Sequence, residues 1–199
     1  IIDSAYGLPF PHIVFTEANP IWTEQTILCM SLSKFGLPAA RTGIMLAPAE
    51  VIRMITSMNA IFNLAQGSFG PALVLDMVAS GETIRSSSDC IKPYYKHKAG
   101  RAIALLKQEL RGVDFRIHKP EGAIFLWLWL PGFPLSSEEL YRRLKQRGVL
   151  VISGHHFFPG LAADWRHKHE CIRITYSMTD AVVEKGIRII ADEIKRIYG

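Results

Sequence analysis

The chain has 199 residues, of which 49% are hydrophobic and 21% are charged, and its formal net charge is +5. This size allows a buried core in one large domain or two small ones. No apolar run approaches the roughly 20 residues of a membrane-spanning helix, and residues 1–4 lack the basic start of a secretory signal. We therefore expect neither a membrane partner nor a signal peptide.

The positive charge and the cysteines are both spread along the chain. Basic residues cluster only briefly, as at residues 141–145 on a predicted helix, which favours a solvated helix face over a nucleic-acid surface. Cys29, Cys90 and Cys171 are far apart and show no CxxC spacing. This pattern favours reduced thiols in a cytoplasmic protein over a disulfide framework or a zinc site.

The first half of the chain alternates between apolar strands and helices. Residues 1–3 resemble the end of a strand without a methionine before it, so we expect a fragment of a longer protein. Apolar runs at residues 26–30 and 43–47 predict strands covered on both faces, and residues 13–15 are a third candidate. Pro48 then opens a helix whose apolar positions follow the helical repeat: Val51, Ile55, Met58, Phe62 and Ala65.

Further helices are predicted before the second half of the chain, where strands and helices alternate over a smaller span. Residues 71–79 predict a buried helix, and residues 82–110 predict a long helical segment that Pro93 kinks or interrupts. We place a domain transition inside this segment. The pattern as a whole is α/β.

The second half predicts a smaller sheet with helices. Residues 123–130 form the clearest strand, and residues 149–152 and 172–176 are short strands. Ser136 and Glu139 form a capping-box pair at the start of a helix. The last helix carries one apolar stripe for docking on this sheet: Val183, Ile187, Ile190, Ile194 and Ile197. We expect the aromatic stripe of the clearest strand to be core packing: Phe125, Trp127 and Trp129.

Residues 31–43 carry the most specific chemical pattern of the chain, because a lysine follows a predicted strand and an arginine comes seven positions later. An isolated lysine at such a place would usually be an ordinary surface residue, but the groups that flank Lys34 favour one that joins covalently to an aldehyde. The hydroxyl of Ser31 and the guanidinium of Arg41 suit a phosphate group, while Ser33 has a less defined role. Together they predict pyridoxal 5′-phosphate as the cofactor.

Asp3 and Tyr6 precede this pattern at the end of the first strand. One interpretation is an Asx-type turn that leads into the following loop. Beside a pyridoxal site, the Asp3 carboxylate would instead pair with the pyridine nitrogen and keep it protonated, which the electron-sink chemistry of the ring requires. The Tyr6 hydroxyl would donate to the phenolic oxygen of the ring.

Arg173 is flanked by apolar residues in a predicted strand, where an unpaired charge is costly. It forms either a buried ion pair, with a residue such as Glu170 or Asp180, or a bidentate clamp on a substrate carboxylate. Four histidines of one loop-rich stretch suggest a metal, but no carboxylate or cysteine completes a ligand set at standard spacing. We expect no metal site there, at His155, His156, His167 and His169.

These motifs together resemble the fold-type-I pyridoxal-phosphate aminotransferases. The likeness is carried by residues 3–11, 29–43, 118–129 and 154–161, and it covers essentially the whole chain in order. It implies an α/β fold made of the C-terminal part of the large mixed-sheet domain and a small α+β C-terminal domain. The corresponding division is residues 1–90 for the large domain, 91–111 for a linking helix and 112–199 for the small domain.

The resemblance also implies an activity and partners. It places the cofactor on Lys34, the substrate α-carboxylate on Arg173, and the other cofactor contacts on Asp3, Tyr6, Ser31, Ser33 and Arg41. It implies a cytoplasmic homodimer that acts on amino acids and 2-oxo acids, with transfer of an amino group between L-valine and pyruvate. Two alternatives remain: another fold-type-I enzyme, such as a different aminotransferase or a carbon–sulfur lyase, and a non-catalytic truncated homologue.

Overall fold

The structure, a computed structural model, describes all 199 residues and divides into two compact units. The first unit consists of Ile1–Tyr94 and Glu121–Ala123, and the second consists of Tyr95–Pro120 and Ile124–Gly199. The division falls inside helix α4 (Lys92–Glu109), which occupies most of the stretch expected as a linking helix, residues 91–111. No helix combines the length and the apolar character needed to cross a bilayer.

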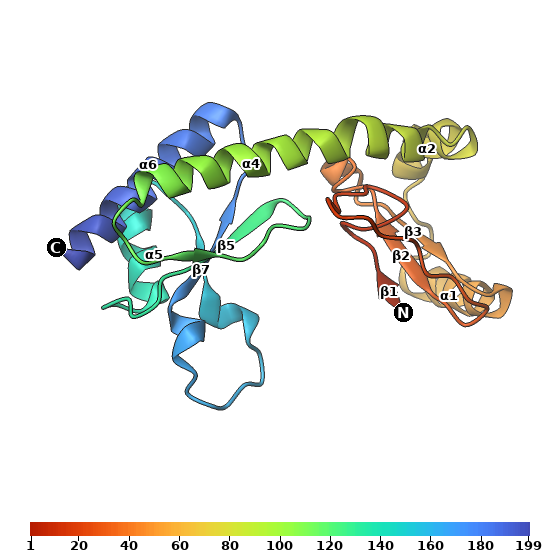
Figure 1. The fold of residues 1–199 in the computed structure, drawn as a ribbon. Helices are drawn as coiled ribbons and strands as arrows, with labels where there is room; N and C mark the ends of the chain where they lie inside the picture. Colours follow the sequence, from red (N-terminus) through yellow and green to blue (C-terminus); the bar gives the residue numbers. More distant parts are fainter. The chain divides into compact units, whose positions relative to one another are not determined.

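A three-stranded mixed sheet forms the centre of the first unit (Figure 1). Its order is β1 (Ile2–Asp3), β2 (Leu28–Ser31) and β3 (Gly43–Leu46), with β1 parallel and β3 antiparallel to β2. The expected strands at 26–30 and 43–47 are thus confirmed in position within two residues, but the expectation that both faces are covered is wrong, since β2 alternates between buried and partly buried residues and β3 has no buried residue. The expectation of a strand at 13–15 is wrong, because Val14 makes only an isolated bridge to Gly122. The backbone turns just before it, at His12, whose φ is 55°.

Two helices follow the sheet, α1 (Ala49–Phe62) and α2 (Phe69–Ala79). One hydrophobic cluster of the unit consists of five buried side chains: Phe10, Leu28, Met30, Leu32 and Val74. Only Gly70 and Val74 of α2 are buried, so the prediction that this helix is buried is wrong. A single narrow face of α2 packs inward, and the remaining apolar side chains of the helix lie at the surface.

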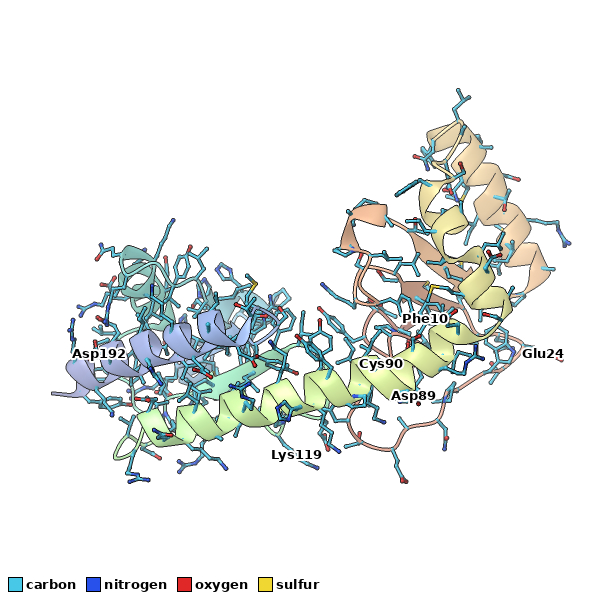
Figure 2. All side chains as sticks on the ribbon, turned by 90° about the horizontal axis from the view of Figure 1, so that it is seen from above. Phe10, Glu24, Asp89, Cys90, Lys119 and Asp192 are labelled. Carbon is cyan, nitrogen blue, oxygen red and sulfur yellow. The ribbon has the colours of Figure 1, made fainter.

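The long helical segment is interrupted where proline predicts it. After α3 (Glu82–Ser86), the turn at Ser87–Ile91 widens to a π-helix, and α4 then begins at Lys92. Pro93 has no N–H for the preceding turn and its ring clashes with the carbonyl four positions earlier, so the hydrogen-bond ladder changes there. Cys90 lies on this widened turn and is exposed (Figure 2).

A four-stranded antiparallel sheet forms the centre of the second unit. Its order is β4 (Arg116–Ile117), β5 (Phe125–Trp129), β7 (Cys171–Thr175) and β6 (Ile152–Ser153). Helices α4 and α6 (Asp180–Tyr198) lie on one side of it, and α5 (Ser137–Gln146) packs beside α6 (Figure 1). Short 3₁₀ turns at Gly154–Phe157 and Arg166–His169 connect β6 to β7.

The helices of this unit follow their sequence signals. Ser136 caps α5 by accepting a hydrogen bond from the backbone N–H of Glu139 at 3.2 Å, as the capping-box pattern predicts. The apolar stripe of α6 faces inward, and Ile187, Ile190 and Ile194 are almost fully buried. The strand expected at residues 149–152 is shorter than predicted. The residues after α5 close that helix instead, with Gly148 at φ 78° and the Val149 N–H bonded to the Leu144 carbonyl.

The expectation that the aromatic stripe of β5 forms the core is also wrong. Leu126 and Leu128 fill the core, at 1% and 0% exposure, whereas Phe125, Trp127 and Trp129 lie on the opposite face and remain partly exposed. Alternate side chains of a strand point to opposite faces, and the helices cover only the leucine face. Aromatic side chains of the segment between β6 and β7 contact this face instead.

Candidate functional site

The ends of two parallel strands bring the first candidate residues to one edge of the sheet. Asp3 pairs with Cys29 in the register of β1 and β2, and the Ser4 N–H donates to the Cys29 carbonyl at 2.7 Å. Ser31 ends β2 two residues further on. Ligands of α/β proteins bind beyond the carboxyl ends of parallel strands, and the Asp3 and Ser31 side chains emerge at such an edge.

Lys34 lies in the turn that follows β2. Hydrogen bonds from the backbone N–H groups of Phe35 and Leu37 to the Leu32 carbonyl, both 3.1 Å, hold this turn closed. The Lys34 side chain is half-buried, and its Nζ lies 5.5 Å from the centroid of the Tyr6 ring. Lys34 and Tyr6 are 28 positions apart in sequence, and the fold brings them together.

Arg41 is held in a local network with both serines. It follows the 3₁₀ turn Pro38–Ala40 in a left-handed conformation, with φ 46° and ψ 40°. Its Nη1 donates to Ser33 Oγ at 3.4 Å and to the Pro38 carbonyl at 3.3 Å. Ser31 Oγ in turn accepts the Ser33 N–H at 3.2 Å. The two serines and the arginine are thus connected, and Arg41 uses only one of its nitrogens in this network.

The charges of this site are not balanced within the chain. Neither Lys34 nor Arg41 forms an ion pair with an acidic side chain. Asp3 Oδ1 accepts the backbone N–H of Ala5 at 3.0 Å, so the Asx-type turn weighed for this residue is present. That hydrogen bond leaves Asp3 Oδ2 without a partner in the chain. The site therefore offers two uncompensated cations and one free carboxylate oxygen.

Helix α2 packs closely against the loop that carries Arg41, a contact that the sequence did not predict. Gly70 of α2 lies against Thr42, whose hydroxyl donates to the Ala40 carbonyl at 2.8 Å. A Cβ at position 70 would overlap Thr42 Oγ1 and would lie 3.0 Å from the Ala40 carbonyl oxygen. Only glycine lets the helix approach this closely. Gly70 directly precedes the helix predicted at residues 71–79, and the glycine itself was the only available signal.

Arg173 belongs to the second unit and lies on β7, directly opposite Trp127 of β5. Its guanidinium carbon lies 4.1 Å from the centroid of the Phe125 ring and 4.7 Å from that of Phe157. The alternative of an ion pair with Glu170 or Asp180 is not realised.

Both of those acids are engaged by other groups. Glu170 pairs with Arg166 at 2.6 Å and accepts the indole N–H of Trp129 at 2.9 Å. Asp180 pairs with Lys98 at 2.9 Å and also with Arg101. Because these partners hold the two carboxylates, the Arg173 guanidinium has no acidic partner in the chain.

The histidine-rich stretch forms an aromatic cluster beside β5 and β7. The His167 ring stacks on Trp165 at 4.7 Å and meets the Trp129 ring at the same distance. His167 Nε2 also lies 3.5 Å from the sulfur of Cys171. Burial raises the pKa of this thiol to about 12, so the group is a neutral thiol at physiological pH.

Comparison with known proteins identifies aminotransferases as relatives of this chain. The family model described as aminotransferase class I and II matches residues 1–190. The chain is 47% identical to the valine–pyruvate aminotransferase of Escherichia coli K12 over 198 residues, which are 100% of this chain and 48% of that protein. The chain therefore spans about half the length of the curated relatives it matches.

Two crystal structures resemble the fold closely. A putative amino-acid aminotransferase from Psychrobacter arcticum has a TM-score of 0.94 and 45% identity, covering 98% of this chain and 45% of its own. The valine–pyruvate aminotransferase from Salmonella typhimurium LT2 has a TM-score of 0.91 and 47% identity, covering 98% of this chain and 50% of its own. Both likenesses extend over the two units.

Replacing Gly70 with alanine should destabilise the protein, because the new methyl group must displace Thr42 or the Ala40 backbone. We expect Gly70→Ala to lower the free energy of unfolding by about 1–3 kcal/mol, as measured by urea denaturation. Gly67→Ala is the matched control, since nothing lies within 4 Å of a Cβ there. Equal stability of the two variants would contradict this account of the packing.

The raised pKa of Cys171 predicts selective labelling of the cysteines. A thiol with a pKa of about 12 exists almost entirely in the unreactive protonated form at pH 8, and reactivity increases only as the pH rises toward that value. Iodoacetamide at pH 8 should therefore label the exposed Cys90 first and leave Cys171 intact in the folded protein. Mass spectrometry of the peptides measures this order, and labelling of all three thiols in guanidinium chloride is the control. Equal rates at Cys90 and Cys171 in the native protein would refute it.

Proposed function

This chain belongs to the family of class I and II aminotransferases, and from this premise we propose that it carries the cofactor lysine and the substrate arginine of a pyridoxal-phosphate-dependent aminotransferase. The proposed reaction moves an amino group from L-valine to pyruvate and gives 3-methyl-2-oxobutanoate and L-alanine. The identity of 47% to a valine–pyruvate aminotransferase supports this choice of substrates.

The observation that carries the proposal is the pair of uncompensated cations after β2. Lys34 supplies a half-buried amine, and Arg41 supplies guanidinium donors that no acid neutralises. A phosphorylated aldehyde provides the two groups that this pair lacks: a carbonyl for the amine and a dianion for the guanidinium. When bound, pyridoxal phosphate supplies a ring that withdraws electrons from the substrate α-carbon.

Each residue of the site has a role that matches its position. Arg41, Ser31 and Ser33 would hold the phosphate, and the network that joins them already orients the donors. Asp3 would hold the positive charge of the ring nitrogen through the carboxylate oxygen that its turn leaves unused. Tyr6, beside the lysine, would donate its hydroxyl to the ring oxygen.

Lys34 would also move the proton of the reaction. Its Nζ would act as general base toward the α-carbon of the amino acid and then return a proton as general acid. Arg173 would bind the α-carboxylate of the substrate, because its guanidinium has no competing acid in the chain. Orientation of the substrate by Arg173 and proton transfer by Lys34 are distinct tasks.

We also propose that the protein acts as a cytoplasmic homodimer. Apolar side chains on α1 and α2 support an interface, since several are more than half exposed: Met54, Ile61, Phe62, Phe69 and Leu75. All three cysteines are free thiols, which suits a reducing compartment.

A substrate panel separates this proposal from its alternatives. A different aminotransferase or a carbon–sulfur lyase would share every cofactor residue named above, whereas a binding module would turn over nothing. Measuring 2-oxo acid formation from a set of amino acids with pyruvate as acceptor should show the highest kcat/KM for L-valine. Preference for another amino donor would contradict the choice of substrate and leave the cofactor residues in place.

Lys34→Ala should abolish covalent attachment of the cofactor and reduce turnover by at least about a thousandfold, because no other residue in the site can replace the amine. Borohydride treatment of the wild-type holoenzyme followed by peptide mapping should place a pyridoxyl group on the Lys34 peptide. The matched control is Lys195→Ala, an exposed lysine on α6. A pyridoxyl group trapped on the alanine variant would refute the assignment of Lys34.

A further inference from the structure

The aromatic face of β5, which is not part of the core, lies directly against Arg173. In the antiparallel register Arg173 stands opposite Trp127 and diagonal to Phe125, so these side chains share one face of the sheet. Phe157 reaches the same place from outside the sheet, at the end of the 3₁₀ turn Gly154–Phe157. Two phenylalanine rings therefore cover the guanidinium, with ring centroids at 4.1 and 4.7 Å from its central carbon.

The turn that carries Phe157 is held firmly on β7. Gly154 is buried, and a Cβ at that position would lie 2.7 Å from the Cys171 carbonyl oxygen and 2.8 Å from the Lys168 carbonyl oxygen. The Phe157 ring is also braced by Trp127, whose ring meets it edge-on at 5.1 Å and 90°. Phe157 thus has a defined position although 38% of it is exposed.

This arrangement controls which part of the guanidinium is available. A guanidinium is planar, stacks on aromatic rings through its faces and donates hydrogen bonds from its edge. Aromatic contact does not neutralise the charge, whereas an acidic partner would compete with a substrate carboxylate for the same donors. The rings restrict the side chain and leave its N–H edge free for bidentate binding of a carboxylate.

We infer that Phe157, with Phe125, is a positioning residue that orients Arg173 for the substrate carboxylate. This inference rests on the proposed role of Arg173. Phe157 acts through the arginine and does not itself take part in the reaction. Its removal should weaken recognition of the carboxylate while leaving the proton transfer at Lys34 largely intact.

The test compares Phe157→Leu, Phe157→Tyr and Phe158→Leu in the holoenzyme. Phe158 is the matched control, since its ring packs on Trp127 and Trp165 and makes no contact with the Arg173 guanidinium. We expect Phe157→Leu to raise the KM for L-valine about fivefold, the factor that loss of one cation–π contact implies, with kcat changed less than about twofold. Phe157→Tyr, which keeps the ring, should restore the KM to near the wild-type value, and Phe158→Leu should leave it unchanged.

Binding of 3-methylbutanoate, measured by calorimetry, gives a readout that is independent of turnover. This unreactive carboxylate has the branched chain of valine without its amino group, and its Kd should rise in Phe157→Leu by the same factor as the KM. In an Arg173→Gln background the Phe157→Leu change should have no further effect on this Kd, because the two residues act through one group.

The possible failures are distinguishable. If Arg173→Gln leaves the KM for L-valine and the Kd for 3-methylbutanoate unchanged, the carboxylate clamp itself is refuted. If Arg173→Gln raises both but Phe157→Leu raises neither, only the positioning role is overturned. A KM that rises equally in Phe157→Leu, Phe157→Tyr and Phe158→Leu would also overturn it, since that result indicates a general packing effect.

Discussion

The pairing of β5 with β7 is the constraint on which the second unit depends. Opposite residues of an antiparallel pair point to the same face of the sheet, and this register places Leu126 and Leu128 with Ile174 and Ile172 beneath the helices. The same register places Arg173 on the other face. A shift of β7 by one residue would turn Arg173 toward the core and Ile172 and Ile174 away from it, so core packing and orientation of the functional side chain are specified together.

In the first unit, a pair of parallel strands and the loop that follows them position the candidate site residues. Parallel strands end at a common edge, and β1 and β2 therefore deliver Asp3 and Ser31 to one place. Short backbone hydrogen bonds then fold the following loop so that Lys34 faces Tyr6 and Arg41 reaches Ser33. No acidic side chain of the protein pairs with Lys34 or Arg41. Lys98 shows the opposite arrangement, since it is buried and its charge is satisfied by Asp180.

Local signals in the sequence were reliable wherever a single element decided the outcome. Apolar runs predicted β2 and β3, helical periodicity predicted α6, and Ser136 predicted the start of α5. The predictions failed where the outcome depended on which neighbouring helix or strand packs against the element. Helix α2 is as apolar as a buried helix, but it packs inward only at Gly70 and Val74. Apolar character cannot show which face of a strand or helix is covered, because that depends on what packs against it.

The sequence by itself determined the family, the strand that ends before Lys34, and the residue types suited to a phosphorylated aldehyde, since all of these depend on motifs of neighbouring residues. Only the tertiary structure decided the surroundings of Arg173. Glu170 and Asp180 are near it in sequence, yet other basic groups hold them, while Phe125 and Phe157, which are distant in sequence, cover its guanidinium. Side-chain partners across a sheet are set by strand register and by the loops that return to it, and neither is encoded in the residues adjacent to the arginine.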